Sequence, residues 1–269
     1  MLAIIGGSGL TTLSNLDVSH REVVRTPYGE PSGALVFGEI CGKPAMFLPR
    51  HGYGHTIPPH MVNYRANLWA LHHHKATGII SVASVGGIRG DLQPGDIVIP
   101  DQIIDYTSGR KATYFDGNGT PVTHVDFTEP YDRGLRDRIR EAGAALGIEM
   151  KVGSVYAATQ GPRLETAAEI NRLERDGADI VGMTGMPEAV LARELGLPYA
   201  AISVVANHAA GRGDSAKGIH FESLEHVLQE AMGRGRAVIE KLVGCQNGCQ
   251  PMGMSGWTFR RSIRPLSSL

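Results

Sequence analysis

Short apolar runs alternate with segments of helical periodicity along most of this chain, and that alternation limits the fold more than any other feature. Residues 2–5, 78–85 and 199–206 are apolar and short enough to form buried strands. Apolar residues recur at helical spacing in 133–146 and 221–243. Further strands are expected at 34–40, 44–48, 96–99, 151–158 and 180–183, and further helices at 59–74, 165–176 and 188–195. Strands that alternate with helices in this way predict an α/β fold.

The composition predicts one domain and a small-molecule ligand. The 269 residues contain no repeat, and no low-complexity linker interrupts residues 1–244, which we expect to form a single domain. A net charge of -1 supplies no basic surface for nucleic acid or for an anionic membrane. No stretch approaches the roughly 20 apolar residues that cross a bilayer, and the first residues do not resemble a signal peptide.

Residues 245–269 differ in character from the rest of the chain. They are rich in Gly, Ser and Pro and follow no helical or strand period, so we expect an irregular tail and assign it no function. Three cysteines, Cys41, Cys245 and Cys249, are too few for a disulfide framework and indicate a cytoplasmic location. Cys245 and Cys249 could pair, although free thiols are the commoner state in a reducing compartment.

Hydroxyl and cationic side chains follow four of the expected strands. Ser8 lies in a glycine-rich turn after the first strand, Arg50 and His51 follow the hairpin, and Ser84 and Thr184 stand at two further strand ends. Ligands of α/β sheets bind at strand ends, so these side chains together predict a phosphate site. The first turn alone fits a tight strand-to-helix connection equally well, and it lacks the dinucleotide-binding glycine spacing.

Metal and nucleophile chemistry find little support in the sequence. His51, His55 and His60 lie in a Gly- and Pro-rich loop with no interleaved cysteine or carboxylate, so we expect no metal site. The run 72–74 of three histidines is expected on a helix surface, where consecutive side chains point in different directions. No nucleophile elbow or base-flanked cysteine is present.

Several linked motifs resemble the trimeric purine nucleoside phosphorylase and methylthioadenosine phosphorylase family. The resemblance runs over residues 1–243, and the stretch 50–67 is closer to the methylthioadenosine branch. It implies the phosphorylase/hydrolase-like fold, a twisted mixed central sheet flanked by helices. The motifs are Ile4-Ile5-Gly6-Gly7-Ser8-Gly9-Leu10, Arg50-His51-Gly52-x-Gly54-His55, Pro58-Pro59-His60-x-x-Asn63-Tyr64-Arg65-Ala66-Asn67, Gln93-Pro94-Gly95-Asp96, Gly161-Pro162-Arg163 and Met183-Thr184-x-x-Pro187-Glu188.

The family resemblance implies phosphorolysis, in which a phosphate oxygen attacks C1′ of a nucleoside through an oxocarbenium-like transition state. Phosphate is then a co-substrate and no cofactor is needed. A homotrimer is implied, each site being completed by a neighbour's loop, for which His124 is a candidate. The resemblance places Met183 beneath the ribose and implies that phosphate is bound by Ser8, Arg50, His51, Ala83, Ser84 and Thr184.

The purine-recognition residues depart from the methylthioadenosine pattern. Where that branch has Asp-x-Asp, this chain has Asn207-His208-Ala209, and Glu165 replaces a small hydroxyl residue. A carboxylate at Glu165 can accept from N1–H of a 6-oxopurine, and the amide of Asn207 can donate to its O6. We therefore expect Glu165 and Asn207 to be the catalytic pair of a 6-oxopurine enzyme. Taken alone, Glu165 could instead serve a helix N-terminus and Asn207 a turn.

Two alignments give different residues at the position that contacts the 5′ end of the sugar. One places Leu224 there, which suits a methylthio group, and the other places His220 there, which suits a hydroxyl. The likeness of residues 50–67 favours S-methyl-5′-thioinosine as substrate. The alternatives are a general inosine and guanosine phosphorylase, an S-methyl-5′-thioadenosine phosphorylase, and a module that binds nucleoside or phosphate without turnover.

Overall fold

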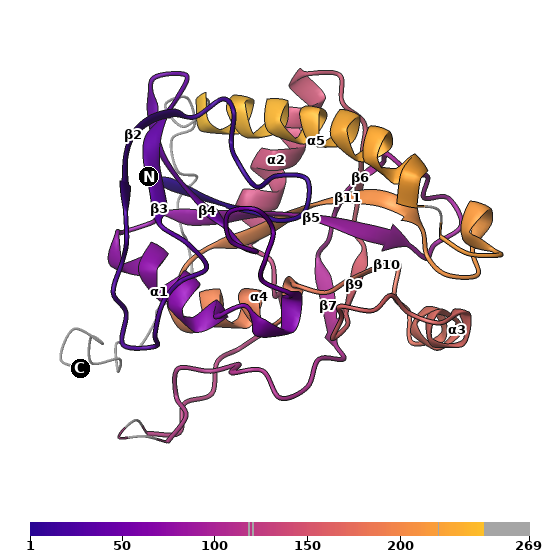
Figure 1. Cartoon of the computed structure of the whole chain (residues 1–269), viewed down its shortest axis with the longest axis horizontal. Coiled ribbons are helices and arrows are strands. Elements are labelled where there is room, and N and C mark those ends of the chain that lie inside the picture. Colours follow the sequence, from indigo (N-terminus) through magenta and orange to yellow (C-terminus); the bar gives the residue numbers. More distant parts are fainter. Residues whose placement is uncertain (118, 120, 220, 245–269) are drawn as a thin grey trace.

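The computed structural model describes residues 1–244 except 118, 120 and 220, with the side chains of 221–225 also left aside. These residues form one sheet of eleven strands with helices on both faces (Figure 1). The strands are β1 (Leu2–Gly6), β2 (Asp17–Glu22), β3 (Leu35–Ile40), β4 (Lys43–Pro49), β5 (Gly78–Gly87), β6 (Ile97–Ile99), β7 (Gln102–Asp105), β8 (Met150–Val152), β9 (Val155–Ala158), β10 (Ile180–Gly182) and β11 (Tyr199–His208). The helices are α1 (Tyr64–His73), α2 (Arg133–Ala145), α3 (Ala167–Arg175), α4 (Gly185–Glu194) and α5 (Phe221–Gly244), with 3-10 turns at η1 (Pro59–Met61) and η2 (Gly213–Ser215).

The central strands are buried on both faces, which explains their continuous apolar sequence. Along β1, Ala3 and Ile5 belong to the core that includes residues of α1 and α4, and Leu2 and Ile4 belong to the core that includes residues of α2 and α5. Successive side chains of a strand point to opposite faces, so one short run supplies both cores. Figure 1 shows α2 and α5 on one side of the sheet and α1 and α4 on the other. The predicted mixed α/β sheet is confirmed.

Strand β5 organises the sheet because it has three neighbours. Parallel β1 pairs with its residues 78–82, parallel β11 runs along its other edge, and antiparallel β10 pairs only with residues 86–87. Residues 83–85 of β5 therefore have no paired strand between β1 and β10. This gap in the pairing exposes the β5 backbone and side chains at the carboxyl end of β1, where ligands of α/β sheets bind.

Two predicted helices begin later than expected because side chains cap them. Residues 59–61 form the turn η1, and α1 begins after Asn63, whose side chain accepts a hydrogen bond from Ala66 N. Helix α3 begins after Thr166, which forms a capping box with Glu169. An Asn or Thr side chain that satisfies the first free N–H groups fixes where a helix can start.

The strand predictions were wrong at three places. The predicted strand at 151–158 is two strands, because Gly153 has φ +77° and turns the chain between β8 and β9. Strands β2 and β7 were not predicted, since none of their residues is buried and no apolar alternation marks them.

The tail expected at 245–269 lies outside the described residues, and so do Cys245 and Cys249. None of the helices that the structure describes is both long enough and apolar enough to cross a membrane. In the histidine run, His72 and His73 are exposed as expected, whereas His74 is half-buried with its ring edge against Phe37.

Candidate active site

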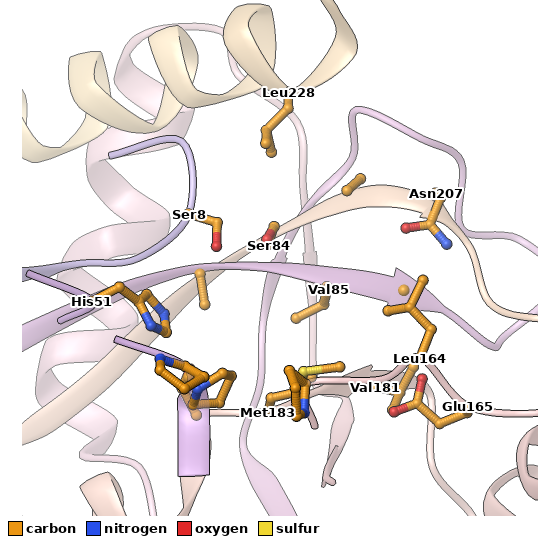
Figure 2. A pocket seen from close by; sticks show the side chains of 18 of the residues that line it. Ser8, His51, Ser84, Val85, Leu164, Glu165, Val181, Met183, Asn207 and Leu228 are labelled. Atoms are coloured by element: carbon orange, nitrogen blue, oxygen red, sulfur yellow. The ribbon is translucent and has the colours of Figure 1, made fainter. Parts of the chain in front are cut away.

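A cavity of about 690 Å³ opens at the gap in the β5 pairing. Its volume lies within the roughly 300–1,000 Å³ range of small-molecule sites. In Figure 2, Ser8, His51 and Ser84 lie at one end, Glu165 and Asn207 at the other, Met183 between the ends and Leu228 above. The described residues that line it also include Arg50, His55, Ile57, Ala83, Val85, Leu164, Val181, Thr184, Ala206, Ala209 and Ile219.

The end near Ser8 carries hydroxyl groups suited to an oxyanion. Ser8 Oγ lies 2.8 Å from Nε2 of His55, which also lines the cavity. Thr184 is buried directly after β10, before the non-helical residues Met186 and Pro187 that precede the regular turns of α4. Its side chain makes no capping hydrogen bond, and the residue lines the cavity. The structure thus brings the predicted Ser8, Ser84 and Thr184 into one cavity with Ala83.

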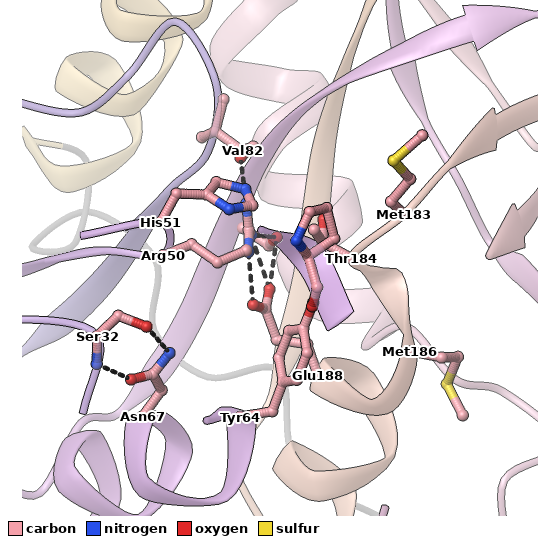
Figure 3. A network of polar contacts seen from close by, with 12 residues as sticks. Ser32, Arg50, His51, Tyr64, Asn67, Val82, Met183, Thr184, Met186 and Glu188 are labelled. Carbon is pink, nitrogen blue, oxygen red and sulfur yellow. Dashed lines mark hydrogen bonds and ion pairs between the residues drawn. The ribbon is translucent and has the colours of Figure 1, made fainter. Parts of the chain in front are cut away.

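Arg50 lines the cavity, as expected of a phosphate-binding residue, but most of its guanidinium N–H groups are already hydrogen-bonded to neighbouring residues. The side chain is fully buried, and its Nε and Nη2 atoms donate to the two carboxylate oxygens of Glu188 at 2.7 and 2.8 Å (Figure 3). Nη2 also donates to Ser81 Oγ and Nη1 to the Val82 carbonyl. A second hydrogen on Nη1 remains for a ligand, because a guanidinium carries five N–H groups.

Glu188 is the centre of a buried network that the sequence analysis did not assign to the site. It is fully buried and also accepts hydrogen bonds from Ser81 Oγ and Tyr199 Oη, each at 2.8 Å. Burial by itself would lower the pKa of Arg50, but the adjacent Glu188 carboxylate outweighs burial and raises that pKa above its ordinary value. The available signal was a carboxylate directly after Pro187 and before the apolar run 189–192.

His51 is held as a neutral ring beside this network. Its Nδ1 lies 2.8 Å from the Ile57 carbonyl, an acceptor, so Nδ1 carries the hydrogen and Nε2 presents a lone pair. Burial lowers the pKa of His51 to about 4, and the positive charge of Arg50 adds to the effect. A neutral His51 can therefore accept a hydrogen bond from the O–H of hydrogen phosphate.

We expect the His51 ring to stay neutral down to about pH 4, whereas a histidine of the unfolded chain titrates near pH 6.5. Between these values the unfolded state binds more protons, so the stability that His51 contributes above pH 6.5 is lost as the pH falls toward 4. NMR titration of the ring, assigned with His51→Gln, measures the midpoint. A midpoint near 6.5 would contradict the burial argument.

Glu165 lines the cavity from the loop before α3, and Asn207 lines it from the end of strand β11. Glu165 Oε1 accepts a 2.6 Å hydrogen bond from Thr159 Oγ1, and Asn207 Nδ2 donates to the His208 carbonyl at 2.6 Å. The capping box of α3 uses Glu169, so helix capping does not account for Glu165. Each side chain still has groups that can hydrogen-bond a ligand: a second carboxylate oxygen on Glu165, and the amide oxygen and one N–H on Asn207.

His208 is a correction to the predicted site. It does not line the cavity, and its ring packs against Gly213, with Nδ1 3.9 Å from a carboxylate oxygen of Asp214. Asn207 and Ala209 do line the cavity, so His208 lies between them and points to the other side of the strand. A bulge between Val205 and Asn207 sets this alternation, which the sequence does not display.

The two predicted 5′ residues are not described: His220 is outside the described residues, and the side chain of Leu224 is among those left aside. Leu228, one helical turn after Leu224, lines the cavity together with Ile219. Met183 lines it as predicted, and its sulfur packs so closely on Gly161 (φ +59°) that no side chain fits there. His124 is exposed and does not line the cavity of its own chain.

No group of three or more His, Cys, Asp or Glu side chains within the described part of the chain is arranged to hold a metal ion. His51 and His55 have ring centroids 4.8 Å apart, but His55 Nε2 is engaged with Ser8. His60, the third histidine of that loop, is exposed and does not line the cavity.

The fold is thus a mixed α/β sheet with one cavity at its strand ends, lined by hydroxyl and cationic residues at one end and by a carboxylate and an amide at the other. The model of the phosphorylase superfamily matches residues 1–244, and the chain belongs to that family.

Relatives and solved structures agree with this assignment. A protein of Pseudomonas syringae pv. tomato named "probable S-methyl-5′-thioinosine phosphorylase" is 49% identical over 241 residues, covering 90% of this chain and 97% of that relative. The 6-oxopurine nucleoside phosphorylase of Pyrococcus furiosus is 44% identical, covering 83% of this chain and 85% of that relative. A structure of Schistosoma mansoni methylthioadenosine phosphorylase in complex with adenine superposes with a TM-score of 0.86 at 31% identity, over 90% of each chain.

Proposed function

We propose that this protein cleaves a 6-oxopurine 5′-methylthionucleoside with phosphate. The reaction converts S-methyl-5′-thioinosine and phosphate to hypoxanthine and 5-methylthioribose 1-phosphate. The observation that carries the proposal is the cavity itself, which sets Ser8, His51, Ser84 and Thr184 at one end and Glu165 with Asn207 at the other. The printed names of the Pseudomonas and Pyrococcus relatives support the same reaction class.

The cavity supports a mechanism without a protein nucleophile. Phosphate held by the hydroxyl groups and the remaining N–H of Arg50 attacks C1′ as the bond from C1′ to N9 breaks, through an oxocarbenium-like transition state. The Nε2 lone pair of His51 accepts the O–H of hydrogen phosphate and so orients its other oxygens toward the sugar. The enzyme contributes positioning and stabilisation of the charge that develops on the departing purine.

Base selectivity follows from the hydrogen-bond donors and acceptors of Glu165 and Asn207, at the purine end of the cavity. Glu165 accepts from N1–H, which a 6-oxopurine has and adenine lacks, and Asn207 donates to O6 while its oxygen accepts from N7–H. Thr159 fixes the Glu165 carboxylate by its 2.6 Å hydrogen bond. Adenine would leave these groups unpaired, which is an effective way to reject a substrate.

The 5′ preference rests on apolar contacts. Leu228, which lies above Ser8 and Ser84 in Figure 2, and Ile219 both line the cavity and offer a methylthio group a surface without hydrogen-bond donors or acceptors. General inosine and guanosine phosphorolysis is the second candidate, favoured by the printed name of the Pyrococcus relative.

Leu228→Asn is expected to lower the preference for the methylthio over the hydroxyl substrate by about 10-fold, since one apolar group in a pocket is worth roughly 10–200-fold in discrimination. The ratio of kcat/KM for S-methyl-5′-thioinosine and inosine measures the effect. Leu146→Asn is the matched control, because Leu146 is 43% exposed and does not line the cavity. An unchanged ratio in Leu228→Asn would remove this residue from the 5′ pocket.

Phosphorus NMR of the reaction mixture tests phosphorolysis itself. We expect a sugar 1-phosphate resonance to grow as inorganic phosphate is consumed. Free methylthioribose without phosphate consumption would indicate hydrolysis, and tight purine binding without turnover would indicate a binding module.

We also propose a homotrimer in which a neighbour's loop completes each site. The loop before α2 supports it, since Val122 is 82% exposed and His124 is exposed and does not line the cavity of its own chain. Light scattering after size exclusion is expected to give three times the chain mass, and a monomer mass would contradict it.

A further inference from the structure

Arg110 lies in the long connection between β7 and α2 and does not line the cavity, yet it contacts two of the cavity's walls. Nη1 donates to the carbonyls of Met183 and Met186 at 2.8 and 2.6 Å. Nη2 donates to the carbonyls of Thr159 and Gln160 at 3.3 and 2.8 Å. One guanidinium thus joins two backbone segments that are about twenty residues apart in sequence.

Both segments carry residues of the proposed site. Met183 and Thr184 follow β10 and form the sugar and anion side of the cavity. Near them, the Tyr64 hydroxyl and the Met186 carbonyl accept hydrogen bonds from Arg110, and the Arg110 guanidinium lies over the Tyr64 ring; Figure 3 labels both residues. The other segment leads from Thr159 through Gln160 to Glu165 on the purine side. Arg110 therefore fixes the spacing between the two walls that hold the sugar and the base.

The contact uses the whole fork of the arginine. Nε donates to Gln160 Oε1 at 3.2 Å, while Gln160 Nε2 donates back to the Ser108 carbonyl, which ties the loop to the same wall. Within the described residues Arg110 forms no ion pair, so its partners are neutral groups in a fixed geometry. A lysine ammonium carries three donors on one atom and lacks the planar fork, so it cannot reproduce the whole set of hydrogen bonds.

We propose that Arg110 is a positioning residue that holds the Met183 wall and the Gln160–Glu165 wall at the separation a bound nucleoside requires. The inference rests on the proposed function of the cavity. It reaches the substrate only through these two walls, and the phosphate contacts from β1 and β5 do not depend on it.

Arg110→Met removes the hydrogen bonds while keeping the side-chain length. We expect kcat/KM for the nucleoside to fall about 100-fold, the size of loss that follows misplacement of reacting groups by about 1 Å. The KM for the nucleoside is expected to rise more than the KM for phosphate, because among the phosphate-binding residues only Thr184 lies on a wall that Arg110 holds, and Arg110→Lys is expected to recover only part of the loss. Arg133→Met is the matched control, since Arg133 is 72% exposed on α2.

Hydrogen exchange gives a readout that does not need turnover. Segments 159–165 and 183–187 are expected to exchange about 10-fold faster in Arg110→Met than in wild type, and to be unchanged in Arg133→Met. Equal exchange in Arg110→Met and wild type, or a loss of kcat with both KM values unchanged, would overturn the positioning role. A wild-type protein without phosphate-dependent turnover would overturn the proposed function instead, and the exchange comparison would still decide the role of Arg110.

Discussion

Glu188→Gln is expected to destabilise the protein by about 3–5 kcal/mol, because breaking a buried ion pair leaves its partner charge uncompensated. Glu188 and Arg50 are both fully buried, and their carboxylate and guanidinium make two hydrogen bonds of 2.7 and 2.8 Å. The amide of Gln has the same shape but one acceptor oxygen fewer. Ser81 and Tyr199 both donate to Oε1, so the amide oxygen would take that position and the amide NH2 would face the Nε–H of Arg50, donor against donor.

Urea denaturation monitored by circular dichroism measures the change. Glu149→Gln is the control: Glu149 pairs with Lys151 at 2.8 Å on the exposed surface, where an ion pair contributes little, so no measurable change is expected. If Glu188→Gln lowered the free energy of unfolding by less than about 1 kcal/mol, Arg50 would have found another partner, and the stability of the network would not depend on the Glu188 carboxylate.

The same substitution tests the link between the network and the anion-binding end. Arg50 reaches the cavity only with the Nη1 hydrogen that its other hydrogen bonds leave over. Releasing the guanidinium from Glu188 is therefore expected to raise the KM for phosphate more than the KM for the nucleoside. Equal effects on both would place Arg50 outside phosphate binding.

Asn207→Asp is expected to shift the base preference from 6-oxopurine toward 6-aminopurine nucleosides. The substitution replaces the donor that serves O6 by an acceptor, which repels O6 and suits an amino group. Sites that hydrogen-bond a substrate group reject analogues that lack it by roughly 10⁴–10⁵, so a change of about 100-fold in the ratio is a conservative expectation. The ratio of kcat/KM for S-methyl-5′-thioinosine and S-methyl-5′-thioadenosine is the measurement.

Glu165→Gln supplies the complementary arm of this test. Loss of the carboxylate is expected to lower kcat/KM for the 6-oxopurine substrate by about 100-fold and to leave the weak reaction with the 6-aminopurine substrate largely unchanged. Glu169→Gln is the control, because Glu169 caps the adjacent helix and does not line the cavity. If Asn207→Asp left the base ratio unchanged, the role assigned to Asn207 would be wrong.

The sequence predicted those elements whose pattern reflects burial. Strand β1 is apolar throughout, and β5 and β11 are largely apolar and buried, interrupted by a few polar residues such as Ser81 and Ser203, so the sequence predicts all three as strands. Strand β2 was missed because an exposed edge strand has no apolar side to reveal it. Helix starts were misplaced where a capping side chain, such as that of Asn63, decided the first turn.

The site was predictable where a side chain follows a strand end, as Ser8 and Thr184 do, because the fold places strand ends together. It was not predictable where tertiary geometry decides. The bulge in β11 turns His208 away from the cavity, and the fork of Arg50 is occupied by a residue 138 positions later. Arg110 escaped notice because its partners are backbone carbonyls, which leave no trace in a sequence.

Purine release from three nucleosides in parallel, with and without phosphate, tests the proposed function most directly. S-methyl-5′-thioinosine, inosine and S-methyl-5′-thioadenosine separate the 5′ preference from the base preference in one experiment. We expect phosphate-dependent hypoxanthine release that is fastest from S-methyl-5′-thioinosine. Adenine release from S-methyl-5′-thioadenosine at a comparable rate would contradict the roles of Glu165 and Asn207, and release that does not require phosphate would contradict phosphorolysis.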